Sequence, residues 1–354
     1  MSNIQVCRAV VHETFEVLTE NVLESRAEFS LGLPRRGNLR EALERLYPRL
    51  TSVGCYPALQ RDQRGLTLYV LERKNKDNLT IYIVLAAMTF FTVFLSGLAL
   101  SAAGERIEGA GGISWSPLAY TLGLLVPLLL HELGHWSLMR LYSTPSSLPY
   151  LVPAPPLQLG FLGTFGAVIN LRWLPPSADA LSLMAIAGPL AGYLAALPLA
   201  IYGLSTSVPA AELPEDTISL NLIPLSFVLI YSLFYSEGGY VLLSSLAFAS
   251  YVVFFVTFLN LIPVAMLDGG HVVRGVAGAR AHWFVSRAFI VGLVVLAILN
   301  PNFMLFALLA LLLFFLSGGR HPGPALMIEG SGKVSFVVAL LYGILFVLTI
   351  PLPV

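Results

Sequence analysis

Long apolar segments follow one another along most of the chain after residue 77, whereas polar residues gather before it. A membrane-spanning helix needs roughly 20 apolar residues, so we predict about seven transmembrane helices. They lie at residues 79–102, 115–139, 180–204, 240–264, 281–299, 302–316 and 334–352, and the sixth is short. The predicted fold class is therefore an α-helical polytopic membrane protein.

A further apolar stretch at residues 218–235 resembles a span but is interrupted by Asn221 and Pro224. If this stretch crossed the membrane, Asp268 would emerge on the opposite side from Arg140. We therefore interpret it as a re-entrant or interfacial segment.

The first 77 residues have the mixed periodicity of a small α/β domain, which we place at 1–77, before a transmembrane domain at 78–354 with its core at 115–275. The pattern predicts a strand at 26–33, a helix at 38–50 with Asn38 as N-cap, a turn at 62–65 and a strand at 66–71. No group of residues here suggests catalysis. We expect this domain to regulate the protein or to select its substrates.

Composition separates the same two parts. Hydrophobic residues make up 56% of the 354 residues and charged residues only 11%, against about 25% charge in soluble domains. Of the 40 charged residues, 22 precede Asn78. The net charge of +0 gives no reason to expect a nucleic-acid partner.

The chain has two cysteines, Cys7 and Cys55, both in the polar part. Two cysteines argue against a disulfide framework and against a cysteine-built metal site, but they leave a single pairing open. The N-terminus is polar and lacks the apolar run of a signal peptide, so we expect no secretory leader.

Basic residues at the ends of the predicted spans set the orientation of the chain. Those before the first span place the N-terminal domain in the cytoplasm, and the cytoplasmic loops then carry Arg73, Lys74, Lys76, Arg140, Arg172, Arg274, Arg280, Arg320 and Lys333. The acidic loop with Glu212, Glu215 and Asp216 falls outside. We predict a multi-pass protein of the cell membrane whose active site opens to the cytoplasm.

The second predicted span contains His131-Glu132-Leu133-Gly134-His135. Residues four apart share one face of a helix, so both histidines can bind one zinc ion, with Glu132 beside the open coordination position. Glu132 is the only acidic residue between Gly109 and Asp179. Ionisable groups within a span are costly, and packing does not explain three of them at this spacing. We predict one Zn²⁺ per chain and Glu132 as the general base.

A catalytic zinc site usually takes a third protein ligand, for which Asp268 is the candidate. It is the only charged residue between Glu237 and Arg274, and Pro263 breaks the apolar helix before it. Two alternatives stay open: Asp268 caps the next helix, or His271 is the third ligand.

Two separated motifs, His131 to His135 and Asn260-Leu-Ile-Pro-Val-Ala-Met-Leu-Asp-Gly-Gly270, resemble the site-2 protease family of intramembrane zinc metalloproteases. Gly163-Thr164-Phe165-Gly166 and Gly188-Pro189 are similar to features of its archaeal and chloroplast-type branch. The resemblance covers roughly residues 79–354. It implies His131, His135 and Asp268 as zinc ligands and Glu132 as catalytic base.

The asparagine of the second motif and the glycine-rich stretch are further candidate site residues. The amide of Asn260 either donates to the reacting oxygen or binds backbone freed by Pro263. Residues 164–171 alternate like a β-hairpin that dips toward the site. We hypothesise that Gly163, Thr164, Phe165 and Gly166 bind the scissile segment of the substrate, the alternative being an ordinary loop.

The function that these observations predict is an intramembrane zinc endopeptidase that hydrolyses transmembrane protein substrates in the lipid bilayer, as in regulated intramembrane proteolysis. The alternative is a zinc-binding membrane protein without proteolysis, either a transporter or an inactive scaffold that binds membrane spans. No internal repeat of the kind found in transporters is visible. The sequence does not predict the oligomeric state.

Overall fold

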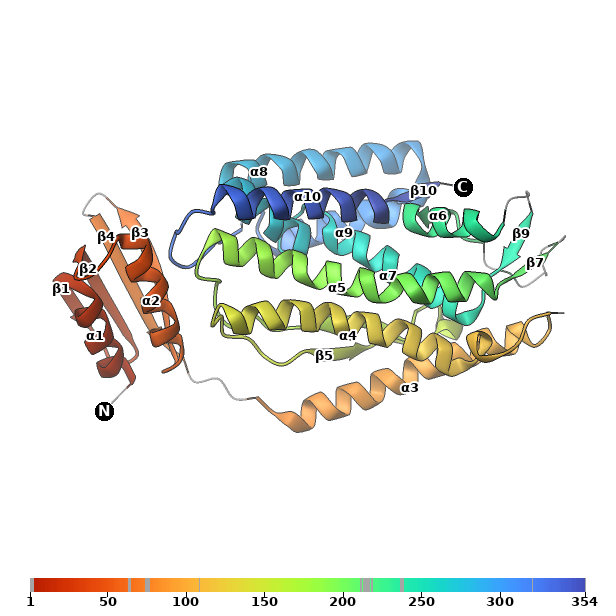
Figure 1. The fold of residues 1–354 in the computed structure, drawn as a ribbon, viewed down its shortest axis with the longest axis horizontal. Coiled ribbons are helices and arrows are strands. Elements are labelled where there is room, and N and C mark those ends of the chain that lie inside the picture. Colours follow the sequence, from red (N-terminus) through yellow and green to blue (C-terminus); the bar gives the residue numbers. More distant parts are fainter. Residues whose placement is uncertain are drawn as a thin grey trace.

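A computed structural model describes residues 3–62, 65–73, 77–107, 109–210, 212, 217, 219–235, 239–319 and 321–353. Some residues used in the sequence prediction lie outside these ranges: Gln63, Arg64, Lys74, Lys76, Glu215, Asp216, Ile218, Glu237 and Arg320. Figure 1 shows a small unit of strands and helices beside one end of a larger helical bundle. We name residues 3–73 the N-terminal unit and the rest the bundle.

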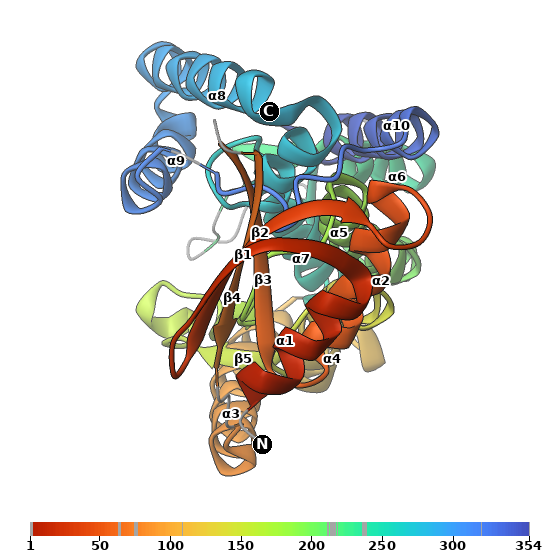
Figure 2. The same ribbon diagram turned by 90° about the vertical axis from the view of Figure 1, so that its left-hand side faces the viewer.

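The N-terminal unit is a four-stranded antiparallel sheet with two helices on one face (Figure 2). Its helices are α1 (Asn3–Thr14) and α2 (Leu39–Thr51), and its strands, in the order β1-β2-β4-β3, are β1 (Phe15–Val22), β2 (Arg26–Pro34), β4 (Gly65–Glu72) and β3 (Cys55–Asp62). The predicted strands at 26–33 and 66–71 and the predicted helix at 38–50 are present. Asn38 caps α2 by accepting a hydrogen bond from the Glu41 N–H at 2.9 Å.

Helix α1 and strands β1 and β3 were not predicted from the sequence. Strand β1 buries only Phe15 among its eight residues, so it lacks the alternation that marks a half-buried strand. The predicted turn joins β3 to β4, because Asp62 pairs with Gly65, although Gln63 and Arg64 lie outside the described residues.

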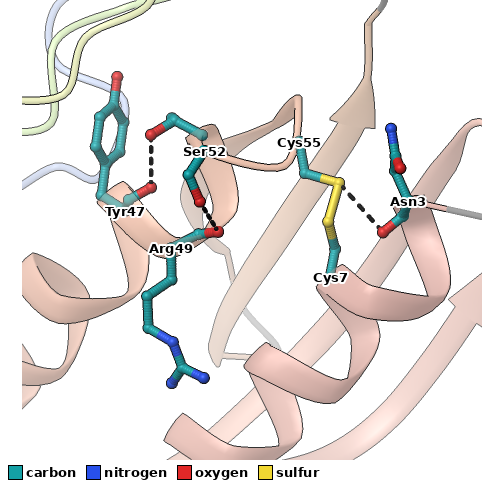
Figure 3. Close-up of a disulfide and its surroundings, with 7 residues drawn as sticks. Asn3, Cys7, Tyr47, Arg49, Ser52 and Cys55 are labelled. Atoms are coloured by element: carbon teal, nitrogen blue, oxygen red, sulfur yellow. Dashed lines mark hydrogen bonds between the residues drawn. A yellow bond between two sulfur atoms is a disulfide. The ribbon is translucent and has the colours of Figure 1, made fainter.

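Cys7 and Cys55 form a disulfide that ties α1 to the first residue of β3 (Figure 3). Both cysteines are fully buried, and Cys55 Sγ lies 3.7 Å from the carbonyl oxygen of Asn3. The pairing left open by the sequence is therefore made within the N-terminal unit.

The core of the N-terminal unit includes residues from the loops of the bundle. Ala325, Leu326 and Ile328, which precede α10, pack with the residues under the sheet, and the Leu59 N–H donates to Ala325 O at 2.8 Å. The Trp173 ring stacks on Tyr56, and its indole N–H donates to Pro57 O at 2.7 Å. These contacts fix the unit against the end of the bundle at which α4 ends and α5 and α10 begin (Figure 1).

Among the residues that the structure describes, five helices of the bundle are long and apolar enough to cross a membrane, so the chain is a polytopic membrane protein. They are α3 (Leu79–Gly104), α4 (Pro117–Leu141), α5 (Ala178–Ser205), α8 (Asp268–Leu299) and α10 (Gly332–Thr349). The predicted spans at 240–264 and 302–316 correspond to shorter apolar helices, α7 (Ser245–Leu261) and α9 (Met304–Leu316). Helix α8 is interrupted at Gly278, whose φ of 83° is not helical, so the predicted span at 281–299 is its second part.

Within residues 219–235, the described part of the stretch predicted to be re-entrant or interfacial, the one helix is short, α6 (Leu225–Phe234). Ten residues of helix rise about 15 Å, half of the hydrocarbon core. Strand β8 (Leu222–Pro224), before α6, pairs with β10 (Pro351–Pro353) after α10, and Tyr235 after α6 donates to Leu204 O near the end of α5. Both ends of α6 thus lie at the end of the bundle far from the N-terminal unit, as does the pair β7 (Val208–Ala210) and β9 (Tyr240–Leu242) (Figure 1).

A β-hairpin lies between α4 and α5 in the chain and packs against α3, at the place where the sequence predicted a β-like re-entrant loop. Its strands are β5 (Tyr150–Pro153) and β6 (Thr164–Val168), and the pairing continues to a bridge between Ser146 and Leu171. Gly163 fits against the backbone of Thr92 and Val93 on α3, where a Cβ atom would overlap it, and Thr92 Oγ1 donates to Gly163 O at 2.6 Å. The hairpin is thereby fixed to the bundle rather than free in solvent.

Candidate metal centre

Three potential metal ligands meet inside the bundle. His131 and His135 lie one turn apart on α4, with 3.1 Å between their Nε2 atoms. Oδ2 of Asp268 lies 3.3 Å from Nε2 of His131 and 3.4 Å from Nε2 of His135. All three side chains are at most 16% exposed.

This triangle fits zinc. Tetrahedral ligands about 2.0–2.1 Å from a zinc ion are spaced about 3.3 Å from one another. Two imidazoles and a carboxylate are also a donor set that zinc enzymes use, with the fourth position left for water or substrate. In the described part of the chain this is the one group of three such side chains whose ligand atoms lie within 4.8 Å of one another, and His271 does not belong to it.

The rise of the helix places the two histidines well inside α4, away from its C-terminal end. Leu141 ends α4, so His135 lies about 9 Å and His131 about 15 Å from that end along the helix axis. Asp268 reaches the same depth because α7 ends at Leu261 and a tight turn follows it. In this turn Ala265 has a positive φ of 54°, an uncommon conformation for a residue with a side chain.

The glycines after Asp268 explain how the turn closes. A Cβ atom on Gly269 would overlap the carbonyl oxygen of Leu261, and one on Gly270 would overlap that of Ala265. The sequence expectation of an unusually close backbone path at these glycines therefore agrees with the structure. Asp268 is the first residue of α8, but Leu267 occupies the N-cap position and no side chain caps the helix there, so the alternative that Asp268 caps this helix is wrong.

Helix α5 packs against both histidines, and its residues Leu181, Met184 and Ala185 also line the cavity described below. His135 Nδ1 donates to Met184 O at 2.7 Å, which leaves Nε2 unprotonated and free to bind a metal in neutral imidazole. Gly188 and Gly192 let α5 approach: a Cβ atom on Gly188 would overlap the His135 ring, and one on Gly192 would lie 3.0 Å from His131 Cβ.

A cavity of about 270 Å³ opens in front of the three ligands. Glu132, which is 9% exposed, lines it beside the histidines. Asn260 lines it too, and its Nδ2 lies 3.4 Å from Nε2 of His131, beside the ligand triangle. The amide is therefore near enough to the metal position to contact a reacting oxygen, in agreement with one of its two expected roles.

The predicted substrate-binding stretch lies mostly beside the cavity rather than in it. The cavity is lined by the next residues of the same strand and its extension, Ala167, Val168, Ile169 and Leu171. Gly163 contacts α3, Thr164 Oγ1 donates to Val152 O at 2.9 Å, and Phe165 is 66% exposed. The alternating pattern at residues 164–171 predicted that this stretch is extended. It could not predict which of these residues line the cavity.

The sequence pattern of peptidase family M50 matches residues 119–300, more than half of the chain. The chain belongs to peptidase family M50. The matched range of the M50 family includes both motifs and all three candidate ligands, which confirms the resemblance to site-2 proteases.

The chain is also similar in sequence to curated proteins that are named as probable zinc metalloproteases. The chain is 32% identical over 175 residues to a probable zinc metalloprotease EGY1, chloroplastic, of Arabidopsis thaliana, and 31% identical over 176 residues to its counterpart in Oryza sativa subsp. japonica. Each match covers 47% of this M50 chain and 30% or 28% of the relative. The chain thus matches under a third of the length of these relatives. No solved structure matches it.

Proposed function

We propose that this protein is an intramembrane zinc endopeptidase that hydrolyses peptide bonds in or near transmembrane segments of other proteins. The observation that carries the proposal is the ligand triangle of His131, His135 and Asp268 with Glu132 beside it, in one cavity of the bundle. Family membership and relatives named as probable zinc metalloproteases support it.

Each polar residue around the cavity has its own role in the proposed hydrolysis. His131, His135 and Asp268 would hold a zinc ion, which would supply a Lewis acid that polarises a carbonyl group and lowers the pKa of water. Glu132 accepts a proton from the attacking water and returns it to the leaving amine. Asn260, whose Nδ2 lies 3.4 Å from Nε2 of His131, would donate a hydrogen bond to the carbonyl oxygen of the scissile peptide bond.

We expect Glu132→Gln to lower turnover of a transmembrane reporter substrate by about 10²- to 10⁴-fold, because glutamine cannot accept the proton. The variant should keep the zinc content of the wild type, since Glu132 is not in the ligand triangle. The experiment compares cleavage and metal content of both purified proteins in bilayers. Equal cleavage by the two would reject the peptidase and leave a zinc-binding transporter or scaffold.

We further propose that the substrate adds as a strand to the hairpin, with residues 163–166 and the cavity-lining part of β6 as its binding surface. Strand β6 pairs with β5 alone among the described strands, so its second edge can bind an extended peptide. Such a peptide would lie along Ala167 and Val168, which line the metal cavity. A membrane helix must unwind before its backbone can be cut, and a strand partner satisfies the exposed backbone groups.

Gly166→Val tests the strand proposal. Gly166 has a φ of 105° with open space around it, so valine should distort β6 locally. We expect cleavage to fall at least about tenfold, a loss of roughly 1.4 kcal/mol in transition-state binding, with zinc retained. Gly160→Val is the matched control, since Gly160 also has positive φ (83°) and open surroundings but precedes the strand. Equal losses in both variants would count against the strand.

The sidedness of the protein is also a proposal: the N-terminal unit and the cavity face the cytoplasm of a cell membrane. Arg140 and Arg172 support it, because basic residues favour the cytoplasmic side. Arg140 lies in the last turn of α4, and Arg172 precedes Trp173, which packs on Tyr56 of the N-terminal unit. The Cys7–Cys55 disulfide points the other way, since disulfides persist in oxidising compartments. Relatives are named chloroplastic.

Leu33, which is 76% exposed on the N-terminal unit, offers a labelling site for this question. In a background with Cys7→Ser and Cys55→Ser, we expect Leu33→Cys to react with a membrane-impermeant maleimide only after the cells are opened. Labelling of intact cells would place the unit outside. We propose that the unit is a separate domain, ending near residue 77, that regulates cleavage or selects substrates.

A further inference from the structure

Three histidines outside the ligand triangle gather beside the metal cavity. His271 lies on the first turn of α8 and lines the cavity, His282 lies farther along α8, and His321 lies in the loop before α10. His321 Nε2 lies 2.6 Å from His271 Nδ1, and the ring of His282 packs edge-on against that of His321. Neither the metal ligands nor the proposed acid–base chemistry uses this group.

The hydrogen bonds of the group run in one direction. The backbone N–H of Gly323 donates to His321 Nδ1 at 3.0 Å, so that nitrogen carries no proton. Burial, together with nearby His271, His282 and Arg274, lowers the pKa of His321 to about 2, so its ring is neutral and its single proton sits on Nε2. That Nε2–H then donates to His271 Nδ1, which in turn leaves the proton of a neutral His271 ring on Nε2.

The Nε2 atom of His271 is the end of this chain of hydrogen bonds. No described residue forms a hydrogen bond with it, although His271 lines the cavity in front of the metal ligands. A fixed, neutral N–H donor at the wall of an active-site cavity is the kind of group that stabilises a negatively charged oxygen in a transition state.

We propose that His271 is a catalytic residue whose Nε2–H donates a hydrogen bond to the oxyanion formed from the substrate carbonyl, and that His321 is the positioning residue that fixes this tautomer. The proposal rests on the peptidase function proposed above. It adds a second donor at the cavity wall to that of Asn260.

The loop that carries His321 is anchored by the N-terminal unit. Four residues after His321, Ala325 accepts a hydrogen bond from Leu59 on β3, and Leu326 packs into the core of the unit. Gly323 has a φ of 79°, and its surroundings leave no room for a Cβ atom beside the Arg274 guanidinium. The position of the catalytic donor therefore depends on the docking of a unit outside the bundle, which gives that unit a physical route to regulate cleavage.

A second metal site is the competing explanation for a histidine pair this close. Binding of a metal at His321 Nε2 needs the ring proton on Nδ1, where it would meet the N–H of Gly323. His282 Nε2 lies 3.3 Å from Ala265 O, to which it can only donate, so this nitrogen is not free as a ligand either. The hydrogen-bond directions therefore favour a chain of hydrogen bonds that fixes the tautomers of His321 and His271 over a second metal site.

Paired substitutions test which of the two ring nitrogens makes the functional hydrogen bond. An asparagine amide reaches the position of Nδ1 and a glutamine amide that of Nε2. We expect His271→Asn to lower kcat by about 10²- to 10³-fold with little change in KM, and His271→Gln to retain more activity. For the same reason His321→Gln should retain more activity than His321→Asn. All four variants should bind about one zinc per chain, as the triangle alone predicts.

A spectroscopic readout keeps the test independent of cleavage. The ring ¹⁵N chemical shifts of His271 should report a proton on Nε2 in the inactive Glu132→Gln protein, and His321→Asn should mix the two tautomers. Wild-type kcat in His271→Asn, a proton on Nδ1 of His271, or a second zinc ion lost in His321→Ala would overturn the proposal. If the wild type cleaves nothing, the proposed peptidase function is wrong. The ¹⁵N measurement would still show whether His321 fixes the tautomer of His271.

Discussion

Asp268→Ala should abolish both metal binding and cleavage. Removal of the carboxylate leaves two histidines on a single helix turn, whereas a catalytic zinc site uses three protein ligands. We therefore expect the zinc content of the purified protein to fall from about one per chain to near zero. Cleavage of a transmembrane reporter should fall to the level of wild-type protein stripped with a chelator. Metal analysis and the cleavage assay measure these two quantities on the same samples.

Asp179→Ala is the matched control for this experiment. Asp179 also lies in the first turn of a bundle helix and is 7% exposed, but its carboxylate accepts hydrogen bonds from the Ser331 N–H at 2.9 Å instead of facing the other ligands. Its loss should leave the zinc content unchanged. Retention of zinc in Asp268→Ala, or equal loss in both variants, would contradict the assignment of the third ligand.

The ligand triangle could be predicted because each part has a local signal. Spacing of four residues places His131 and His135 on one helix face whatever surrounds the helix. Asp268 stands out because charge is rare in apolar sequence. His135 and Asp268 are 133 positions apart in the chain, so their meeting is not a local property; the need for a third ligand suggested it, and the resemblance to a known family implied it. The structure brings the three side chains together.

Other parts of the protein could not be predicted because long-range contacts determine them. The exposed strand β1 exists because β2 pairs with it along most of its length. Leu326 looks like a residue of an ordinary loop, yet it is 1% exposed because the N-terminal unit covers it. His321 was expected to be a loop or interface residue, and its contact with His271 joins residues 50 positions apart. Periodicity within one segment contains no information on such partners.

The extended conformation of the hairpin could be predicted from the sequence, but its position relative to the cavity could not. Its extended conformation followed from the alternation at 164–171 and from the prolines around it. Which residues of the strand face the cavity depends on how the hairpin is fixed to its neighbours. The close fit of Gly163 against α3 sets that position and brings Ala167 and Val168, rather than Gly163, to the cavity.

Gly188→Ala should displace a zinc ligand without changing any ligand residue. Glycine at 188 is the point of closest approach between α5 and the metal site, where an added Cβ atom would overlap Nε2 of His135. The ring cannot turn away without breaking its 2.7 Å hydrogen bond to Met184 O, which lies on the same helix. We expect zinc affinity to fall by at least about 100-fold, the upper range for loss of a group that orients a metal ligand.

Competition with a fluorescent zinc chelator measures this affinity, and Gly292→Ala serves as the control. Gly292 lies within the second part of α8 and has no atom within 4 Å of its would-be Cβ, so alanine there adds the same methyl group without a clash. In addition, alanine favours a helix by about 1 kcal/mol over glycine at both positions. A selective loss of zinc in Gly188→Ala would therefore come from the collision with His135. Similar zinc affinity in the two variants would show that α5 can move away from α4 at no cost, and that the supporting role assigned to it is wrong.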